Sequence, residues 1–411
     1  MTAPYTEKAL IIYELLLSGH HYEYVENLIK IALKYYDIVH VVLAVADDEQ
    51  LQSLQSLSKG YPQRVQLDLV SDDLLNHWLR KLGQRMSEMA NWRLFNNHYQ
   101  KLSRITDSPV VWLSFLDCVA GAIAILGSPC GKAPIIALNI QNICITANEN
   151  QSLSSKIKKS LDIYIYHRLF RQQTILRIYT IDPFLVREFT AHPAKAFEKL
   201  VFVDDPVDLQ TSQSDIGYSK RPLGIPDNRI VILVYGAISM RKGVVELIDA
   251  VESSSNAGCF CVVIAGAIDE SMASVLNGMR YQTLIQSGSL LLHNRFISKK
   301  EEGIFFDSTD IVWVGYKNHN ASSGVLTLAM VSGKPVIATN KGVIGRLCVE
   351  KNLGCVVDIE NKYEIIFSLN HLKNRENRMI YSNNQSFFAH DHCWIAFEKI
   401  FMSYKDTTET R

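Results

Sequence analysis

Residues 320–340 combine a small polar loop, a helix and a buried strand, an arrangement that can bind phosphate. Ser322, Ser323 and Gly324 precede an apolar run at helical spacing, which ends before a glycine and a short strand. Either serine can cap this helix, whose first backbone N–H groups then lack a partner within the helix and attract anionic oxygen. Gly324 and Val325 would bring the main chain close to such a ligand. The other interpretation is an ordinary capped helix that binds nothing.

A second stretch places two cations at the end of a predicted strand. The apolar run 230–234 is followed by Gly236 and then by Arg241, Lys242 and Gly243, which open a helix. In an open parallel sheet, ligands bind at the carboxyl edge of the strands, where such a turn lies. Arg241 and Lys242 can therefore act as a phosphate clamp. Alternatively, they are ordinary solvated charges.

Together the two stretches resemble the donor-binding half of GT-B glycosyltransferases, particularly of the family 4 type. In that family a strand ends in a glycine, and a lysine followed by a glycine comes six residues later, as Gly236, Lys242 and Gly243 do here. The later family element is a glycine-containing loop, a helix and a Gly-Lys-Pro-Val-Ile strand, matched here by residues 323–337.

The resemblance implies an α/β fold of two Rossmann-like, doubly wound parallel-sheet domains that face a cleft. It implies transfer of a sugar from a nucleotide-sugar donor, UDP- or GDP-linked, with retention of configuration and without a metal ion or other cofactor. The acceptor stays open among a saccharide, a lipid-linked molecule, a small molecule and a peptide. By resemblance, the backbone near Phe296 would meet the nucleotide base, while its ring is expected in the core, and Tyr316 would line the donor side of the cleft.

Three positions depart from the family pattern. Members usually carry an arginine where this chain has Ala237, and a pair of glutamates at the positions of Asn320 and Leu328, which contact the donor sugar and the ribose. Leu328 cannot accept a hydrogen bond from a ribose hydroxyl. The departures favour a second hypothesis, a binding or regulatory protein that kept the fold and lost turnover. A GT-B epimerase is a third hypothesis.

The first half of the chain offers three candidate catalytic residues. His20 and His21 follow the first predicted strand and could orient an acceptor or serve as a base. Asp117 ends a later strand, at an edge where the family usually carries a cleft histidine or acid. The alternatives are histidines satisfied at a helix start, and an aspartate that caps the helical run after it.

The length of 411 residues suits two domains of about 200 residues each. We predict the boundaries as follows: an acceptor-side domain at 1–205, a linker at 206–228, a donor-binding domain at 229–390, and a helix at 391–411 that crosses back to the first domain. Buried strands are predicted at 9–17, 38–46, 65–70, 110–116, 134–146 and 176–180, and then at 230–234, 259–265, 290–296, 311–314, 335–338 and 355–357.

Composition limits the partners and the compartment. Forty-two basic and 42 acidic residues give a net charge of zero, which argues against a nucleic-acid binder. The eight cysteines form no Cys-X-X-Cys pair and are interpreted as buried thiols in a reducing compartment. Because neither a signal peptide nor an apolar run of about 20 residues is evident, we expect a cytoplasmic protein.

A basic and aromatic stretch at 72–106 raises the possibility of peripheral membrane contact. It is predicted to be helical, and its cations include Arg80, Lys81 and Arg85, interleaved with tryptophan, phenylalanine and tyrosine. Such a helix can rest on an anionic membrane. The alternative is a helix half buried against its own sheet.

Overall fold

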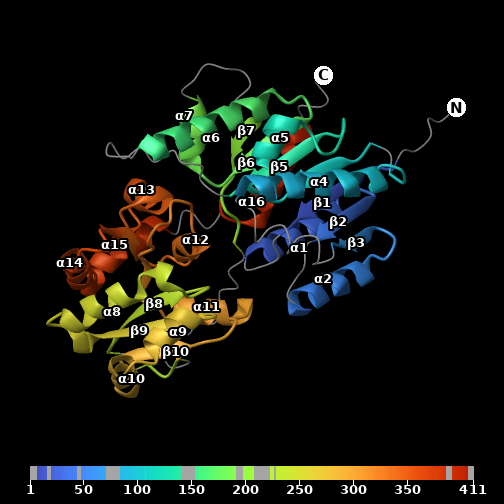
Figure 1. Cartoon of the computed structure of the whole chain (residues 1–411). Coiled ribbons are helices and arrows are strands. Elements are labelled where there is room, and N and C mark those ends of the chain that lie inside the picture. The colour runs from blue at the N-terminus through green and yellow to red at the C-terminus, as the bar shows by residue number, and fades with distance from the viewer. Residues whose placement is uncertain are drawn as a thin grey trace. The chain divides into compact units, whose positions relative to one another are not determined.

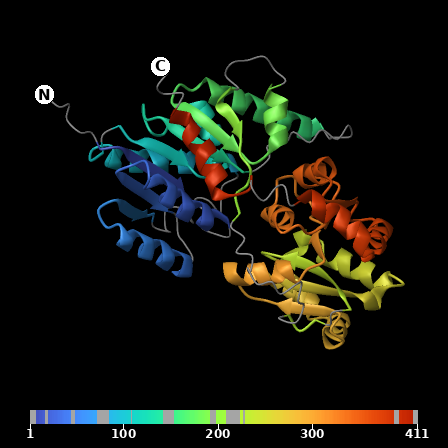
Figure 2. The same ribbon diagram turned by 180° about the vertical axis from the view of Figure 1, so that it is seen from behind.

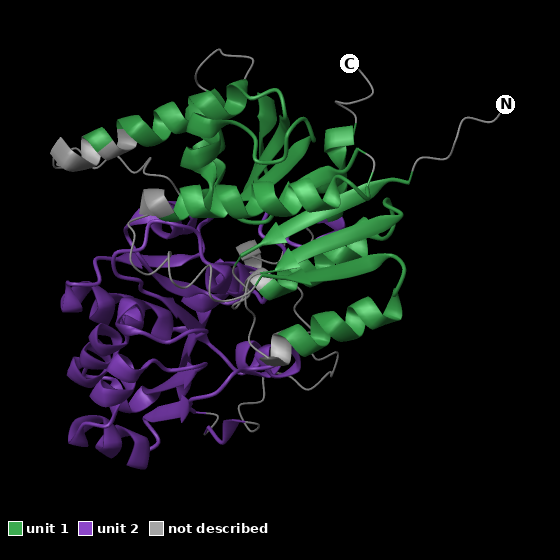
Figure 3. Cartoon of the chain, turned by 45° about the vertical axis from the view of Figure 1, so that its right-hand side comes forward, with its two compact units in different colours: residues 1–203, 398–411 green, residues 204–397 purple. Residues whose placement is uncertain are grey.

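The chain divides into two compact units, each built on its own parallel sheet. The computed structural model describes residues 7–15, 20–43, 48–70, 84–106, 108–140, 153–190, 198–207, 223–225, 228–385 and 391–405. Unit 1 comprises residues 1–203 together with 398–411, and unit 2 comprises residues 204–397 (Figure 3). The described residues 398–405 therefore pack with the first unit.

The sheet of unit 1 has, among the described residues, seven parallel strands in the order β3-β2-β1-β4-β5-β6-β7. The strands are β1 Ala9–Glu14, β2 Ile38–Leu43, β3 Val65–Leu69, β4 Val110–Leu113, β5 Ile135–Asn139, β6 Ile175–Thr180 and β7 Leu200–Phe202. Most strand positions are buried, as expected for runs of branched apolar residues covered by helices on both faces.

Helices cover both faces of this sheet because the right-handed crossovers run in opposite directions on either side of β1 and β4 (Figures 1 and 2). They are α1 His20–Ala32, α2 Asp48–Gly60, α4 Gln84–Leu102, α5 Ala120–Leu126, α6 Leu153–Arg171, α7 Pro183–Thr190 and the part of α16 Trp394–Met402 from Glu398 onward. Helices α4 to α7 share one hydrophobic core with the sheet. On the other face, Phe401 of α16 packs edge-on against Trp112, with ring centroids 4.8 Å apart.

Unit 2 repeats the design with six parallel strands in the order β10-β9-β8-β11-β12-β13. The strands are β8 Ile230–Tyr235, β9 Phe260–Ala265, β10 Leu290–His293, β11 Ile311–Val314, β12 Val336–Thr339 and β13 Gly354–Val357. The helices are α8 Val244–Ser253, α9 Glu270–Leu276, α10 Met279–Gln286, α11 Lys299–Asp307, α12 Gly324–Val331, α13 Gly342–Lys351, α14 Lys362–Lys373 and α15 Arg375–Gln385. Helices α11 to α13 enclose one core cluster, and α8 to α10 with α14 enclose the other.

The predicted fold class is confirmed, and the differences concern element ends. The strand predicted at 290–296 ends at His293, and the helix predicted at 72–106 is observed as α4, with residues 71–83 outside the described part of the chain. Strand β7 lies where no strand was predicted, next to the Asp-Asp-Pro sequence that follows it. Most of the predicted linker, residues 208–222, also lies outside the described part.

No helix in the described residues combines the length and the apolar character needed to cross a membrane. The seven cysteines described there are free thiols.

Candidate functional site

The candidate site lies where the strand order of unit 2 reverses. Strands β8 and β11 are neighbours, and the helices that follow them, α8 and α12, lie on opposite faces of the sheet. The loops at their carboxyl ends therefore diverge, and this is the usual ligand position in such sheets. Both phosphate-binding stretches predicted from the sequence come from these two loops.

Lys242 is a buried cation at this edge. Only 4% of the residue is exposed, and its Nζ donates to the carbonyl of Tyr235 at 2.8 Å and to the hydroxyl of Tyr316 at 2.7 Å. No carboxylate among the described residues forms an ion pair with it. An ammonium has three donors, so one proton of Lys242 remains for a ligand. A buried charge without a counter-charge is costly, which favours an anion at this position.

Two glycines set the position of Lys242. Gly243 is the N-cap residue of α8 with φ +64°, and a Cβ there would clash with the carbonyl oxygen of Gly315. The Trp313 indole donates to the carbonyl of Lys242 at 2.7 Å, so the turn is tied to the end of β11. Gly236 has φ +94°, which lets the chain turn directly after β8.

Arg241 is exposed and is oriented by His319. Its Nη1 lies 3.2 Å from His319 Nδ1, while His319 Nε2 lies 3.0 Å from the carbonyl oxygen of Ser322. Since a guanidinium only donates and a carbonyl only accepts, these contacts require the neutral imidazole with its proton on Nε2. Burial, together with the charges of Arg241 and Lys242, lowers the pKa of His319 and favours this form.

The N-terminus of α12 is open for an anion. Ser323 is the N-cap residue, but its hydroxyl makes no capping bond and donates instead to the Tyr316 hydroxyl at 3.2 Å. The first intrahelical donor is Thr327, which bonds to the Ser323 carbonyl. Within the described structure, the N–H groups of Gly324, Val325 and Leu326 make no hydrogen bond. Unpaired amides at a helix start bind anionic oxygen.

Tyr316 joins the two loops. Its hydroxyl accepts from Lys242 and from Ser323, and its ring lies under both cations, 4.4 Å from Lys242 Nζ and 5.1 Å from the Arg241 guanidinium carbon. Because both acceptor positions of the hydroxyl are used, its own proton is free to be donated. We refer to Arg241, Lys242, Tyr316, Ser323 and the open amides of α12 as the anion cradle.

Asn320 and Leu328, which stand at the positions of the family's glutamate pair, differ in their exposure to solvent. Asn320 is exposed, and its carbonyl accepts from the N–H of Val343 at 3.0 Å. Leu328 is fully buried in the core beneath α12 and reaches no ligand without a change in packing. Ser322 is half buried, and its carbonyl oxygen accepts from His319.

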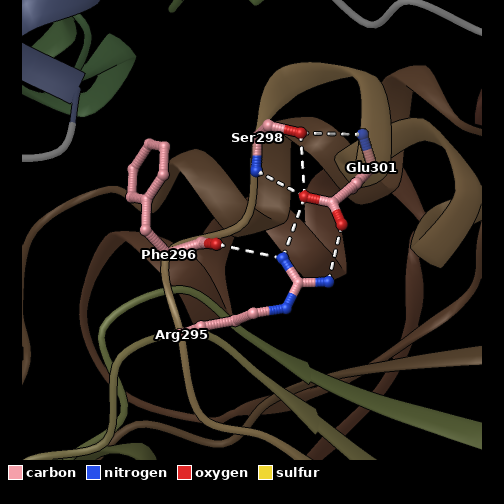
Figure 4. A network of polar contacts seen from close by, with 4 residues as sticks. All are labelled: Arg295, Phe296, Ser298 and Glu301. Atoms are coloured by element: carbon pink, nitrogen blue, oxygen red, sulfur yellow. Dashed lines mark hydrogen bonds and ion pairs between the residues drawn. The ribbon is translucent and has the colours of Figure 1, made fainter.

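The expectation that the ring of Phe296 lies in the core is wrong, because 67% of this residue is exposed. Arg295 forms a bidentate pair with Glu301, at 2.9 and 2.6 Å, and also donates to the Phe296 carbonyl at 3.2 Å. Glu301 accepts from Ser298, whose hydroxyl caps α11. Figure 4 shows these polar groups together and the Phe296 ring turned away from them. Strand β10 has already ended, so alternation no longer directs the ring inward.

In unit 1, Asp117 lies beyond β4 at the corresponding reversal of strand order, since β1 and β4 are neighbours. It is buried, and its Oδ2 accepts from the N–H of Ile140 at 3.1 Å, which ties the end of β4 to the end of β5. It does not cap α5, whose N-cap residue is Val119. Helix α1 begins at His20; the side chains of His20 and His21 lie outside the described part of the structure.

Sequence reasoning missed how the cradle is held together. His319 orients Arg241, and Tyr316 links Lys242 to Ser323. The contacts of Arg241 with His319 and of Lys242 with Tyr316 each join residues more than 70 positions apart. A histidine and a tyrosine directly before the 322–324 loop were the only local signal for these contacts.

Comparison with known proteins supports the architecture. Among similar structures, HepE of Anabaena, solved with UDP, has 16% identity and a TM-score of 0.64, covering 98% of this chain and 100% of that one. The chain has the GT-B fold. Other GT-B matches are a Rickettsia africae glycosyltransferase (12% identity, TM-score 0.65, covering 99% and 100%) and the UDP-forming trehalose-phosphate synthase of Burkholderia vietnamiensis (10% identity, TM-score 0.62, covering 96% and 99%).

The sequence itself matches one family model. Residues 216–386, which lie within unit 2, match the model of the family described as glycosyl transferases group 1. The match contains both loops of the anion cradle. A comparison with curated protein sequences gives no match.

Proposed function

We propose that the chain transfers a sugar from a nucleoside diphosphate sugar to an acceptor, with the diphosphate held in the anion cradle. The observation that carries the proposal is the buried ammonium of Lys242, which has no carboxylate partner among the described residues and lies in the same cradle as the open amides of α12. Arg241 adds a second cation on the exposed side. A diphosphate supplies the negative charge that this arrangement lacks.

UDP is the nucleotide we propose to test first. HepE was solved with UDP and with UDP-glucose, and the Burkholderia synthase is described as UDP-forming. These proteins share the fold with this chain at low identity, so GDP and ADP serve as comparisons. The exposed Phe296 and the backbone beside it stand in the region proposed for the base.

The cradle would act on the leaving group. As the bond between the sugar C1 and the diphosphate oxygen breaks, negative charge grows on the diphosphate, and a new C1–O bond forms to the acceptor hydroxyl, which releases its proton. Preorganised donors at such an oxygen lower the barrier. Arg241, Lys242 and the α12 amides can provide this charge compensation from the chain itself, in keeping with the proposed metal-independent, retaining transfer. His20, His21 and Asp117 remain the proposed candidates on the acceptor side.

A second candidate function is nucleotide binding without turnover. The specific observation in its favour is Leu328, which is fully buried where the family carries a glutamate toward the ribose. In that case the cradle would bind UDP, and no sugar would be transferred.

Two measurements on the same protein separate these functions. The first is a thermal-shift panel of UDP, GDP, ADP and their common sugars, because a ligand that binds only the folded state raises the melting temperature. The second is release of UDP from UDP-glucose, alone and with saccharide acceptors. Binding with release supports the transferase, and binding without release supports the second candidate. No shift with any nucleotide would contradict both.

A further inference from the structure

Helices α4, α5 and α6 of unit 1 lie side by side over one face of the sheet. Trp92 of α4 donates to the carbonyl of Gly127, just after α5, at 2.8 Å, and Arg168 of α6 donates to the carbonyl of Ala124 in α5 at 3.3 Å. All three helices contribute to a single core. We call the outward side chains of these helices the α4–α6 face.

This face exposes several large apolar side chains. Ile125 at the end of α5 is 76% exposed, and Ile157 and Tyr164 on α6 are 62% and 58% exposed. Leu126 and Met89 beside them are also exposed. Ile157 and Tyr164 lie on the same side of α6, two turns apart. Scattered exposed apolar residues are normal, but a group on adjoining helices marks a binding surface.

The exposed charges of the face are positive. Arg93, Lys101 and Arg104 are exposed along α4 and just beyond it, and Arg168 and Arg171 are exposed on α6. The sequences of the three helices contain two acidic residues, Glu88 and Asp162. Glu88 is buried beneath α5, where it accepts from the N–H of Ala122, and Asp162 is half buried. Thus no fully exposed acid was found on this face within the described residues.

A second exposed apolar pair provides a comparison. Tyr363 and Phe367 on α14 of unit 2 are 78% and 74% exposed, one helical turn apart. Their surroundings include the exposed carboxylates of Glu360, Glu364 and Glu376. The chain therefore exposes apolar side chains in two electrostatic settings, and only the α4–α6 face is free of exposed acids among the described residues.

We propose that the α4–α6 face docks on the surface of a lipid bilayer that contains anionic headgroups. Isoleucine, leucine and tyrosine would enter the boundary between headgroups and acyl chains, while the long arginine and lysine side chains would reach the phosphates. Positive charge without exposed acids gives the electrostatic attraction, and the apolar side chains give the insertion. Neither Trp92, which is half buried, nor Phe95, which is buried in the core, belongs to this surface.

Vesicle flotation with the full chain tests the proposal. Vesicles of phosphatidylcholine alone are compared with vesicles in which one lipid in three is phosphatidylglycerol. We expect binding to the anionic vesicles, weaker binding in 0.5 M salt than in 0.1 M salt because screening reduces attraction between exposed charges, and little binding to phosphatidylcholine.

Three variants give the residue-level test. Neutralising Arg93 and Arg171 to alanine should lower the partition constant roughly 25-fold, at about fivefold per cation. Changing Ile125 and Tyr164 to serine should lower it tenfold or more, because both insert apolar surface. The matched control changes Tyr363 and Phe367 to serine and should bind as the unaltered chain does. Since all of these side chains are exposed, unchanged melting temperatures verify the fold.

Several results would overturn the proposal. One is equal flotation with both kinds of vesicle, and another is loss of binding in the α14 control. Absence of flotation, combined with a concentration-dependent dimer that the Ile125 and Tyr164 changes disperse, would assign the face to contact between copies of this chain instead. UDP binding should be the same in all three variants, so failure here is distinguishable from failure of the proposed transferase function.

Discussion

Replacing Lys242 with methionine separates stability from anion binding more sharply than any other change. Methionine keeps the buried stem of the side chain and removes the charge. The change loses two hydrogen bonds, to the Tyr235 carbonyl and the Tyr316 hydroxyl, and it also removes a buried cation that has no carboxylate partner in the described structure. Because these effects oppose each other, we expect the free energy of unfolding to change by less than about 2 kcal/mol.

The effect on nucleotide binding should be much larger. A charge-assisted hydrogen bond to phosphate is worth about 1.5–3 kcal/mol, so the Kd for UDP should rise roughly 10- to 100-fold. Isothermal titration calorimetry measures the Kd, and thermal unfolding without ligand measures the stability.

Lys334→Met is the matched control. Lys334 is also a buried lysine of unit 2, and its Nζ donates to the carbonyl of Asp307 at 3.2 Å, outside the anion cradle. This variant should bind UDP as the unaltered chain does. If Lys242→Met retained full UDP affinity, or if both variants lost it equally, the anion cradle would be wrong as described.

Three further predictions concern the parts that hold the site. Gly243→Ala should lower the free energy of unfolding by at least about 2 kcal/mol in chemical denaturation, because φ is +64° and the new Cβ would meet the Gly315 carbonyl; an unchanged midpoint would contradict the close approach. Burial lowers the pKa of His319, so as pH falls below about 6.5 this histidine is protonated in the unfolded chain before it is protonated in the folded one. The free energy of unfolding without ligand should therefore decline below that pH, and it should decline less in His319→Gln. Equal pH dependence of the unfolding free energy in both proteins would argue against this. Arg295 and Ser298 lower the pKa of Glu301 to about 2, so the contribution of the Glu301 carboxylate to stability is complete above its ordinary pKa near 4.5 and is lost as pH falls toward 2. In Glu301→Gln, the melting temperature should therefore fall less steeply with pH in this acid range. An unchanged dependence of the melting temperature on pH would refute the pairing.

The sequence was sufficient for every described strand except β7, and for placing both loops of the cradle after buried strands. Apolar runs of four to six residues separated by helical periodicity predict parallel strands, and the spacing of Gly236, Lys242 and Gly243 places a cation at the end of β8. These signals are local, because each depends on residues within one strand and the turn after it. The observed pairing of β8 with β11 brings both predicted stretches to one edge of the sheet.

The contacts inside the cradle could not be predicted in the same way. Lys242 and Tyr316 are separated by 74 residues, and only the pairing of β8 with β11 makes them neighbours. The exposed ring of Phe296 was missed because β10 ends three residues earlier, and the Arg295–Glu301 pair then fixes the direction of the loop. The burial of Leu328 can be deduced from helical periodicity once α12 is known to begin at Gly324, because the start of the helix determines which of its sides faces the core.

The most direct test of the anion cradle is a crystal structure of the chain with UDP. We expect diphosphate oxygens within about 3 Å of the N–H groups of Gly324 and Val325, with the guanidinium of Arg241 beside them. UDP bound elsewhere, with those amides still without a phosphate partner, would contradict it.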